Sequence, residues 1–111
     1  MLLHFTHADR PKDGTKLVTQ VKKGDTVVMG SDGIFDNLSE SRMCEIITET
    51  SWSPKLPLVV KKIIDEARLV SFDETAETPY AKEAKKNRYE EYKDGLGGKL
   101  DDVSCIVVRC V

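Results

Sequence analysis

Two short apolar runs, each lying against an aspartate-rich turn, constrain the fold of this chain more than any other feature. The first run, Thr26–Gly30, continues directly into the segment SDGIFDN at residues 31–37. The second, VSCIVVRCV at residues 103–111, directly follows the segment GGKLDD at residues 97–102. Both runs are rich in β-branched residues and bounded by turn residues, which predicts two short strands. The almost wholly apolar second run predicts a strand that is buried on both faces.

The residues before the first run predict a hairpin. Residues 16–21, KLVTQV, are β-prone, and the turn that follows them contains Gly24, which is free to take a positive φ. Two short β-prone segments joined by a glycine turn are typical of a β-hairpin.

Two helices are predicted between the aspartate turns. Asn37 is a candidate N-cap, with Glu40 completing a capping box, for a helix that ends near Thr50. A second helix begins around Pro54 and Pro57, because proline is tolerated at the first helical positions. Its apolar positions recur every three or four residues and predict one buried face: Leu56, Val59, Val60, Ile63, Ile64 and Ala67.

Residues 73–95 differ from the rest of the chain. Acidic and basic side chains alternate there, with Tyr80, Tyr89 and Tyr92 between them. This pattern predicts a solvated helix or an ordered loop that the tyrosines anchor to the body, and a recognition surface is the alternative. The glycines at 95, 97 and 98 predict a loop.

Composition excludes several classes of protein. A length of 111 residues favours a single domain, and a net charge of -2 argues against a nucleic-acid-binding face. No apolar run approaches the eighteen residues that a membrane span needs, so we expect no membrane partner. Cys44, Cys105 and Cys110 match no zinc spacing and predict buried thiols in a reducing intracellular setting, cytoplasm or organelle matrix.

The aspartates beside the two predicted strands are candidate metal ligands. Asp32 and Asp36 follow the first strand, and Asp101 and Asp102 precede the second. Carboxylates at strand ends can converge on one point, and Mg²⁺ and Mn²⁺ prefer such oxygen ligands. Gly33 would let the backbone turn sharply beside Asp32. Alternatives stay open, because Asp-Gly is a common turn and an aspartate often caps a helix or solvates a loop.

The order of these pieces resembles the C-terminal part of the metal-dependent protein phosphatases of the PP2C type. The resemblance runs from about residue 21 to residue 111 and rests on the SDG-x-x-DN and GGK-x-DD-x-S elements. Residues 78–84, beginning Thr78-Pro79-Tyr80-Ala81, also resemble a stretch found in the mitochondrial and plastid branch of the family.

The resemblance implies a fold. The family has an α+β sandwich of two antiparallel sheets with helices on both outer faces. Residues 1–111 would then be the C-terminal fragment of one phosphatase domain whose N-terminal half is absent. We expect three or so strands, with two helices covering one face. Exposed sheet edges would invite self-association.

The resemblance also implies an activity. In the family, a binuclear Mn²⁺ or Mg²⁺ centre activates a water that hydrolyses phosphoserine and phosphothreonine in proteins, so the catalytic group is not a side chain. By motif, Asp32 and Asp101 match ligands of the second metal, and Asp36 matches the ligand of a weaker third metal. Gly33 matches the turn glycine, and Asp102 would orient the turn beside the ligands.

This sequence also departs from the family pattern. The D-G-x-x-G segment, whose aspartate bridges both metals in the family, belongs to the N-terminal half of the domain and does not occur before Asp32, since Asp13-Gly14 is followed by Thr15 and Lys16. His4 and His7 lie outside the matched region and receive no role. We therefore expect little or no activity from the chain alone. The alternatives are a non-catalytic regulatory or interaction module with a PP2C-derived fold, and a small metal-binding module unrelated to phosphatases.

Overall fold

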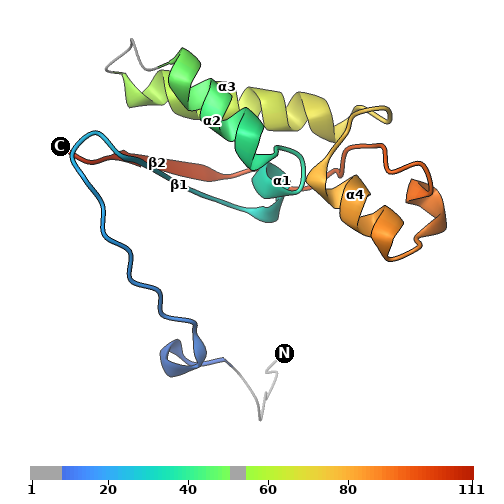
Figure 1. Ribbon diagram of the computed structural model, residues 1–111, viewed down its shortest axis with the longest axis horizontal. Coiled ribbons are helices and arrows are strands. Elements are labelled where there is room, and N and C mark those ends of the chain that lie inside the picture. Colours follow the sequence, from blue (N-terminus) through green and yellow to red (C-terminus); the bar gives the residue numbers. More distant parts are fainter. Residues whose placement is uncertain (1–8, 51–54) are drawn as a thin grey trace, which may run out of the picture.

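The computed structural model describes residues 9–50 and 55–111, and within them it places helices over one side of a small sheet (Figure 1). The chain is α+β, as predicted. Its elements, in chain order, are η1 (Pro11–Asp13), β1 (Thr26–Gly30), α1 (Asp32–Phe35), α2 (Glu40–Glu49), α3 (Leu56–Ser71), α4 (Pro79–Lys86), η2 (Glu90–Tyr92) and β2 (Cys105–Arg109).

The sheet of the described residues consists of β1 and β2 paired antiparallel, with Thr26 opposite Arg109 and Gly30 opposite Cys105. The predicted hairpin is therefore wrong, because residues 16–21 form no strand. The described residues accordingly contain two strands instead of the three or so expected. Gly24 does take the predicted positive φ, at 92°. Its turn leads into β1, and the Gly24 N–H donates to the Cys110 carbonyl at 2.8 Å. The β-branched C-terminal run is thus the partner of β1, although most of the chain separates the two strands.

β2 is not buried on both faces, contrary to the prediction. Cys105 and Val107 are half-buried and pack against the helical core, whereas Ile106 and Val108 are more than half exposed. Val27 and Met29 of β1 are exposed in the same alternation. An apolar run can thus belong to a strand with one open face, because only the pleat and the covering elements decide which side is buried.

The core lies between the sheet and the helices. α3 packs across β2 and against α1 and α2, which covers one face of the sheet (Figure 1). The expected apolar face of the second helix is confirmed, since Val59, Ile63 and Ala67 are fully buried. The other buried core residues are Ile34, Leu38, Met43 and Ile46. A short two-stranded sheet is marginal alone, so the fold depends on this helical cover.

The ends of α2 and α3 agree only in part with the positions predicted from the sequence. The first predicted helix ends as expected, with Thr50 at the C-cap of α2. Its N-cap is Ser39 and not Asn37, because the Ser39 hydroxyl accepts from the Arg42 N–H at 3.1 Å. Pro57 occupies an early position of α3, as predicted, and Pro54 lies outside the described residues.

The charged segment at 73–95 is ordered and anchored. Thr78 caps α4 by accepting from the Ala81 N–H, and its hydroxyl donates to the Gly97 carbonyl at 2.6 Å. The rings of Tyr80 and Tyr92 meet edge to face with centroids 5.2 Å apart. Two of the three tyrosines therefore hold the segment, as predicted, whereas Tyr89 is exposed. The predicted glycine loop at 95–98 is also present.

No helix among the described residues is both long enough and apolar enough to cross a membrane.

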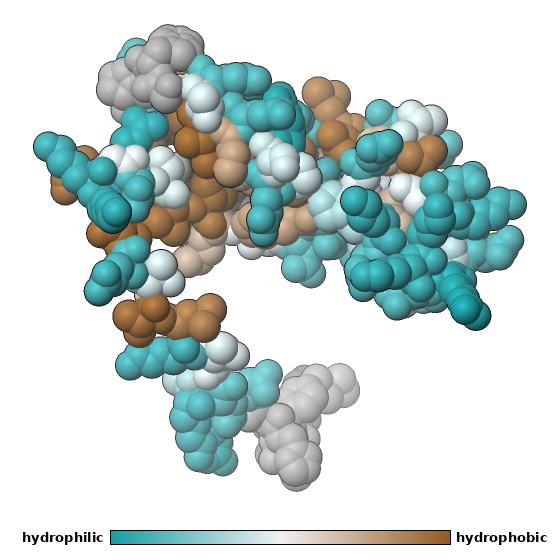
Figure 2. Space-filling model, in the orientation of Figure 1, coloured by the Kyte–Doolittle hydropathy of each residue, from teal (hydrophilic) through white to brown (hydrophobic). Residues whose placement is uncertain are grey.

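The sheet face opposite the helices carries a row of exposed apolar side chains. Val27, Met29, Ile106 and Val108 are each 42–65% exposed. Figure 2 shows hydrophobic residues gathered along the sheet beneath the hydrophilic outer surface of the helices. Contiguous exposed apolar surface of this kind favours association.

We expect the 111-residue chain to self-associate through this face. Replacing Ile106 with Lys should lower the apparent mass at high concentration, because a charge in the interface would be desolvated. Leu69→Lys is the matched control, since Leu69 is an exposed apolar residue of α3. Light scattering is the measurement, and a clean monomer at high concentration for the unmodified chain would contradict the expectation.

Candidate metal site

Three of the predicted aspartates converge at the end of the sheet. Asp32 begins α1, Asp36 follows the last residue of α1, and Asp101 lies in the loop before β2. Each offers a carboxylate oxygen, and these atoms lie within 4.8 Å of one another. The structure thus brings together the three residues that the two motifs predicted as ligands. Asp36 neither caps a helix N-terminus nor stands apart as a solvated turn.

The side chain of Asn37 joins the two loops that carry these aspartates. Its amide donates to the Gly33 carbonyl and to the Lys99 carbonyl, both at 2.9 Å. Its carbonyl oxygen accepts from the Lys99 N–H at 2.8 Å. Asn37 is only 3% exposed, so these bonds form away from water, where an unmade bond is costly. Asn37 therefore fixes the position of the second loop relative to α1.

Ser31 makes a second link between the loops. Its hydroxyl donates to the Asp102 carbonyl at 3.0 Å and accepts from the Ser104 N–H at 3.1 Å. The Ser31 N–H donates to the Ser104 carbonyl at 3.0 Å, which continues the pairing of β1 and β2 to the end of the sheet. β1 therefore leads almost directly into Asp32, and Asp101 lies shortly before β2.

Position 33 requires glycine because the backbone of Asp102 lies very close to it, and not because the chain turns sharply there. It lies inside α1 with no positive φ, and a Cβ built there would lie 2.3 Å from the Asp102 carbonyl oxygen. Any larger residue would push the two loops apart. The predicted importance of Gly33 stands, but its physical reason differs from the one inferred from the sequence.

Asp102 contributes its backbone to the site. Its carbonyl accepts the Ser31 bond, and its N–H donates to Asp101 Oδ1 at 2.8 Å. Among the described residues, the close carboxylate cluster comprises Asp32, Asp36 and Asp101 and does not include Asp102.

A lysine lies against the carboxylate cluster. Lys99 Nζ is 3.6 Å from Asp36 Oδ2, 4.0 Å from Asp101 Oδ2, and 4.7 Å from the centroid of the Tyr80 ring. Desolvation lowers the pKa of Lys99, but Asp36, Tyr80 and Asp101 raise it by more, so its pKa lies above the ordinary value. The cluster therefore already attracts one cation, which fits a site of net negative charge.

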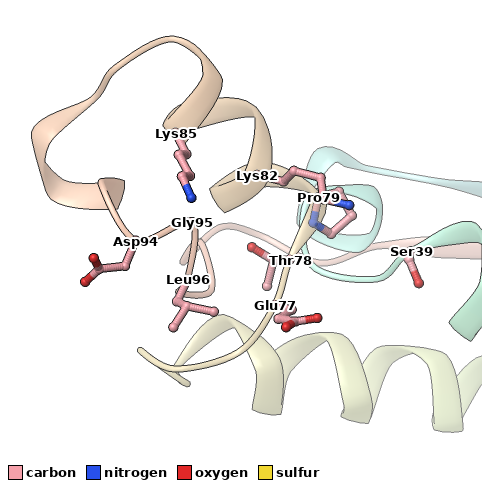
Figure 3. A pocket seen from close by; sticks show the side chains of 9 residues that line it. All are labelled: Ser39, Glu77, Thr78, Pro79, Lys82, Lys85, Asp94, Gly95 and Leu96. Atoms are coloured by element: carbon pink, nitrogen blue, oxygen red, sulfur yellow. The ribbon is translucent and has the colours of Figure 1, made fainter.

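An open groove of about 700 Å³ lies between α4 and the loop after η2 (Figure 3). The Tyr80 N–H at the start of α4 donates to the Asp36 carbonyl at 3.0 Å, which attaches α4 to the cluster. Lys82 and Lys85 of α4 line the groove together with Glu77 and Asp94. The groove therefore carries both signs of charge and does not select an anion.

Sequence reasoning missed the roles of Ser31, Asn37 and Lys99. Each of these residues lies inside one of the two aspartate motifs, so its place in the motif could have indicated a role at the site. Asn37 was assigned to a helix cap because asparagine is frequent there. Only contacts between residues more than sixty positions apart distinguish a loop clamp from a cap.

The donor set fits a hard divalent cation. All three converging groups are carboxylates, two of them exposed and one half-buried, so water can complete a coordination shell. No thiol or imidazole belongs to the cluster among the described residues, which disfavours a softer metal.

The sequence of the chain is similar to those of known proteins. It is 36% identical over 107 residues to the probable protein phosphatase 2C 26 of Arabidopsis thaliana, with 89% of the chain aligned. The chain belongs to the protein phosphatase 2C family. It is also 28% identical over 108 residues to the protein phosphatase PTC7 homolog fig of Drosophila grimshawi, with 95% of the chain aligned. No family model matches it.

The PP2C chain also matches a solved structure of the family, described as the X-ray structure of the photosystem II phosphatase PBCP. The TM-score is 0.71 at 31% identity, and the match covers 84% of this chain and 38% of that one. The partial PP2C fold predicted from the sequence is confirmed. The chain spans 35% of the Arabidopsis relative and 34% of the Drosophila relative, about a third of each.

We expect Asn37→Ala to destabilise the chain by about 3 kcal/mol, because two carbonyls and one N–H would lose their buried partner. Asn37→Asp should not restore stability, because its second carboxylate oxygen would face the Gly33 and Lys99 carbonyls, which are acceptors, and a charge would be buried. Urea denaturation measures the free energy of unfolding. The matched control is Asn87→Ala at the exposed end of α4, and equal losses from both alanine variants would contradict the clamp.

Proposed function

We propose that this PP2C chain forms part of an enzyme that hydrolyses phosphoserine and phosphothreonine in proteins at a binuclear Mn²⁺ or Mg²⁺ centre. The observation that carries the proposal is the convergence of Asp32, Asp36 and Asp101 within 4.8 Å at the junction of two family motifs. The substrate would be a phosphoprotein, by analogy with relatives named as protein phosphatases.

In this proposal the residues of the chain have distinct tasks. Asp32 and Asp101, one from each loop, hold one metal ion between them, and Asp36 serves a weaker third ion. Gly33 keeps the loops in contact, and Asp102 orients the second turn. Bound divalent ions supply a water of lowered pKa and neutralise phosphate charge. The side chains themselves bind and orient, and none acts as the nucleophile.

We propose that the chain alone is inactive because it supplies only one side of the centre. Its carboxylates come from two segments at one end of the sheet, and no D-G-x-x-G segment precedes Asp32 to add the bridging aspartate. The D-G-x-x-G pattern at residues 94–98 follows α4, and its Asp94 is not part of the close carboxylate cluster. A longer phosphatase domain would complete the coordination.

A non-catalytic regulatory or interaction module is the second candidate. The observation that favours it is that the chain spans only about a third of the length of its relatives. Retention of all three converging carboxylates favours the enzyme instead, since an interaction module has no use for them.

We also propose a reducing intracellular setting, cytoplasm or organelle matrix. Cys44, Cys105 and Cys110 are free thiols, which is compatible with such a setting. The prediction that they are buried is wrong, because Cys44 is exposed and Cys105 and Cys110 are half-buried.

We expect the chain to bind Mn²⁺ through the cluster. Asp32→Asn and Asp101→Asn should each weaken binding at least about tenfold, because each removes a charged ligand. Electron paramagnetic resonance of free Mn²⁺ gives the dissociation constant. Asp94→Asn, at an exposed aspartate outside the cluster, is the control and should leave it unchanged. Equal affinity in all four proteins would refute the site and favour the interaction module.

We expect the chain to hydrolyse an aryl phosphate negligibly in the presence of Mn²⁺, and Asp32→Asn to be equally silent. A complete PP2C enzyme in the same assay is the positive control. Robust turnover by the chain that disappears in Asp32→Asn would mean that the chain completes a site alone or by self-association.

A further inference from the structure

Lys99 is held at three points. Its backbone N–H and carbonyl are both bonded to the buried Asn37 amide. Its ammonium lies 4.7 Å from the centroid of the Tyr80 ring. The same ammonium pairs with Asp36 and Asp101 at 3.6 and 4.0 Å. These contacts hold the positive charge of Lys99 beside the carboxylate cluster and limit its movement into solvent.

The position of the ammonium coincides with two of the three proposed metal ligands. Asp36 and Asp101 offer oxygens to Lys99 and also belong to the close cluster with Asp32. Two cations attracted to the same carboxylates repel each other, and this repulsion is stronger where part of the surrounding water is excluded. The Lys99 side chain is 34% exposed, so it has room to swing away from the cluster.

We infer that Lys99 is a built-in counter-cation that competes with the divalent metal and lowers the affinity of the cluster for it. The inference rests on the proposed function and adds a regulator to that site. In the absence of metal, the ammonium neutralises part of the repulsion among the carboxylates and keeps the loops together. When metal binds, the ammonium leaves Asp36 and Asp101, so Lys99 acts as a competing cation and not as a ligand.

Metal affinity tests the inference directly. Lys99→Met keeps roughly the length of the side chain and removes its charge. Mn²⁺ should then bind roughly thirtyfold more tightly, the effect in water of a unit charge about 4 Å from a divalent ion. Lys99→Arg keeps the charge and should restore the lower affinity. Lys85→Met is the control, because the Lys85 side chain points toward Gly95 in the groove (Figure 3). All four proteins are titrated with Mn²⁺ at one pH and one ionic strength.

A second measurement follows the lysine itself. Titration with diamagnetic Mg²⁺ should shift the NMR signals of the Lys99 side chain and the Tyr80 ring with the same midpoint as the backbone signals of Asp32. A merely structural Lys99 would keep its contact with Tyr80, so the nuclear Overhauser effect between the two side chains would survive saturation with Mg²⁺.

The outcomes separate the inference from the proposed function. Binding that is lost in Asp32→Asn but unchanged or weakened in Lys99→Met overturns the role of Lys99 and leaves the metal site standing. Absence of Mn²⁺ binding in both the unmodified chain and Lys99→Met overturns both. Tighter binding in Lys99→Met, reversed in Lys99→Arg and accompanied by the Mg²⁺-dependent shifts, supports the inference.

Discussion

The clamp made by the Asn37 side chain is the interaction on which the candidate site depends. Three hydrogen bonds from one buried amide fix the Lys99 backbone against α1. Without them, the Ser31 contacts would be the remaining described side-chain link between the Asp32 segment and the Asp101 loop. A buried amide suits this task because it donates and accepts at once, and because the cost of leaving either group unpaired makes the arrangement specific.

The sheet depends on the same junction. β1 and β2 pair over five residues each, and a two-stranded sheet of this size has little stability of its own. The Ser31 contacts extend the pairing into the loops, and α3 covers one face. The opposite face remains apolar and exposed, which agrees with a chain that spans only about a third of the length of its phosphatase relatives.

The charge balance at the cluster links the fold to the proposed chemistry. Three carboxylates at one end of a small sheet repel one another unless a cation lies among them. Lys99 provides that cation from within the chain, and Tyr80, at the start of α4, supports it. The segment at 73–95, which its sequence predicted to be a solvated helix or an anchored loop, therefore contributes to the electrostatics of the site. Its attachment through Thr78 and Gly97 keeps that contribution in place.

By itself, the sequence determined the features that depend on local chemistry. The apolar face of α3, the C-terminal end of α2, the turn at Gly24 and the three converging aspartates were all predictable, because periodicity, turn preferences and motif order are encoded over short spans.

Only the tertiary structure decided which strand pairs with β1, which face of β2 is open, and whether Asn37 caps a helix or clamps a loop. These outcomes depend on contacts between residues more than sixty positions apart, such as Asn37 with Lys99 and Gly33 with Asp102. Local propensity cannot choose among them, because asparagine serves caps and clamps alike, and an apolar strand packs equally well on either side until other elements cover it.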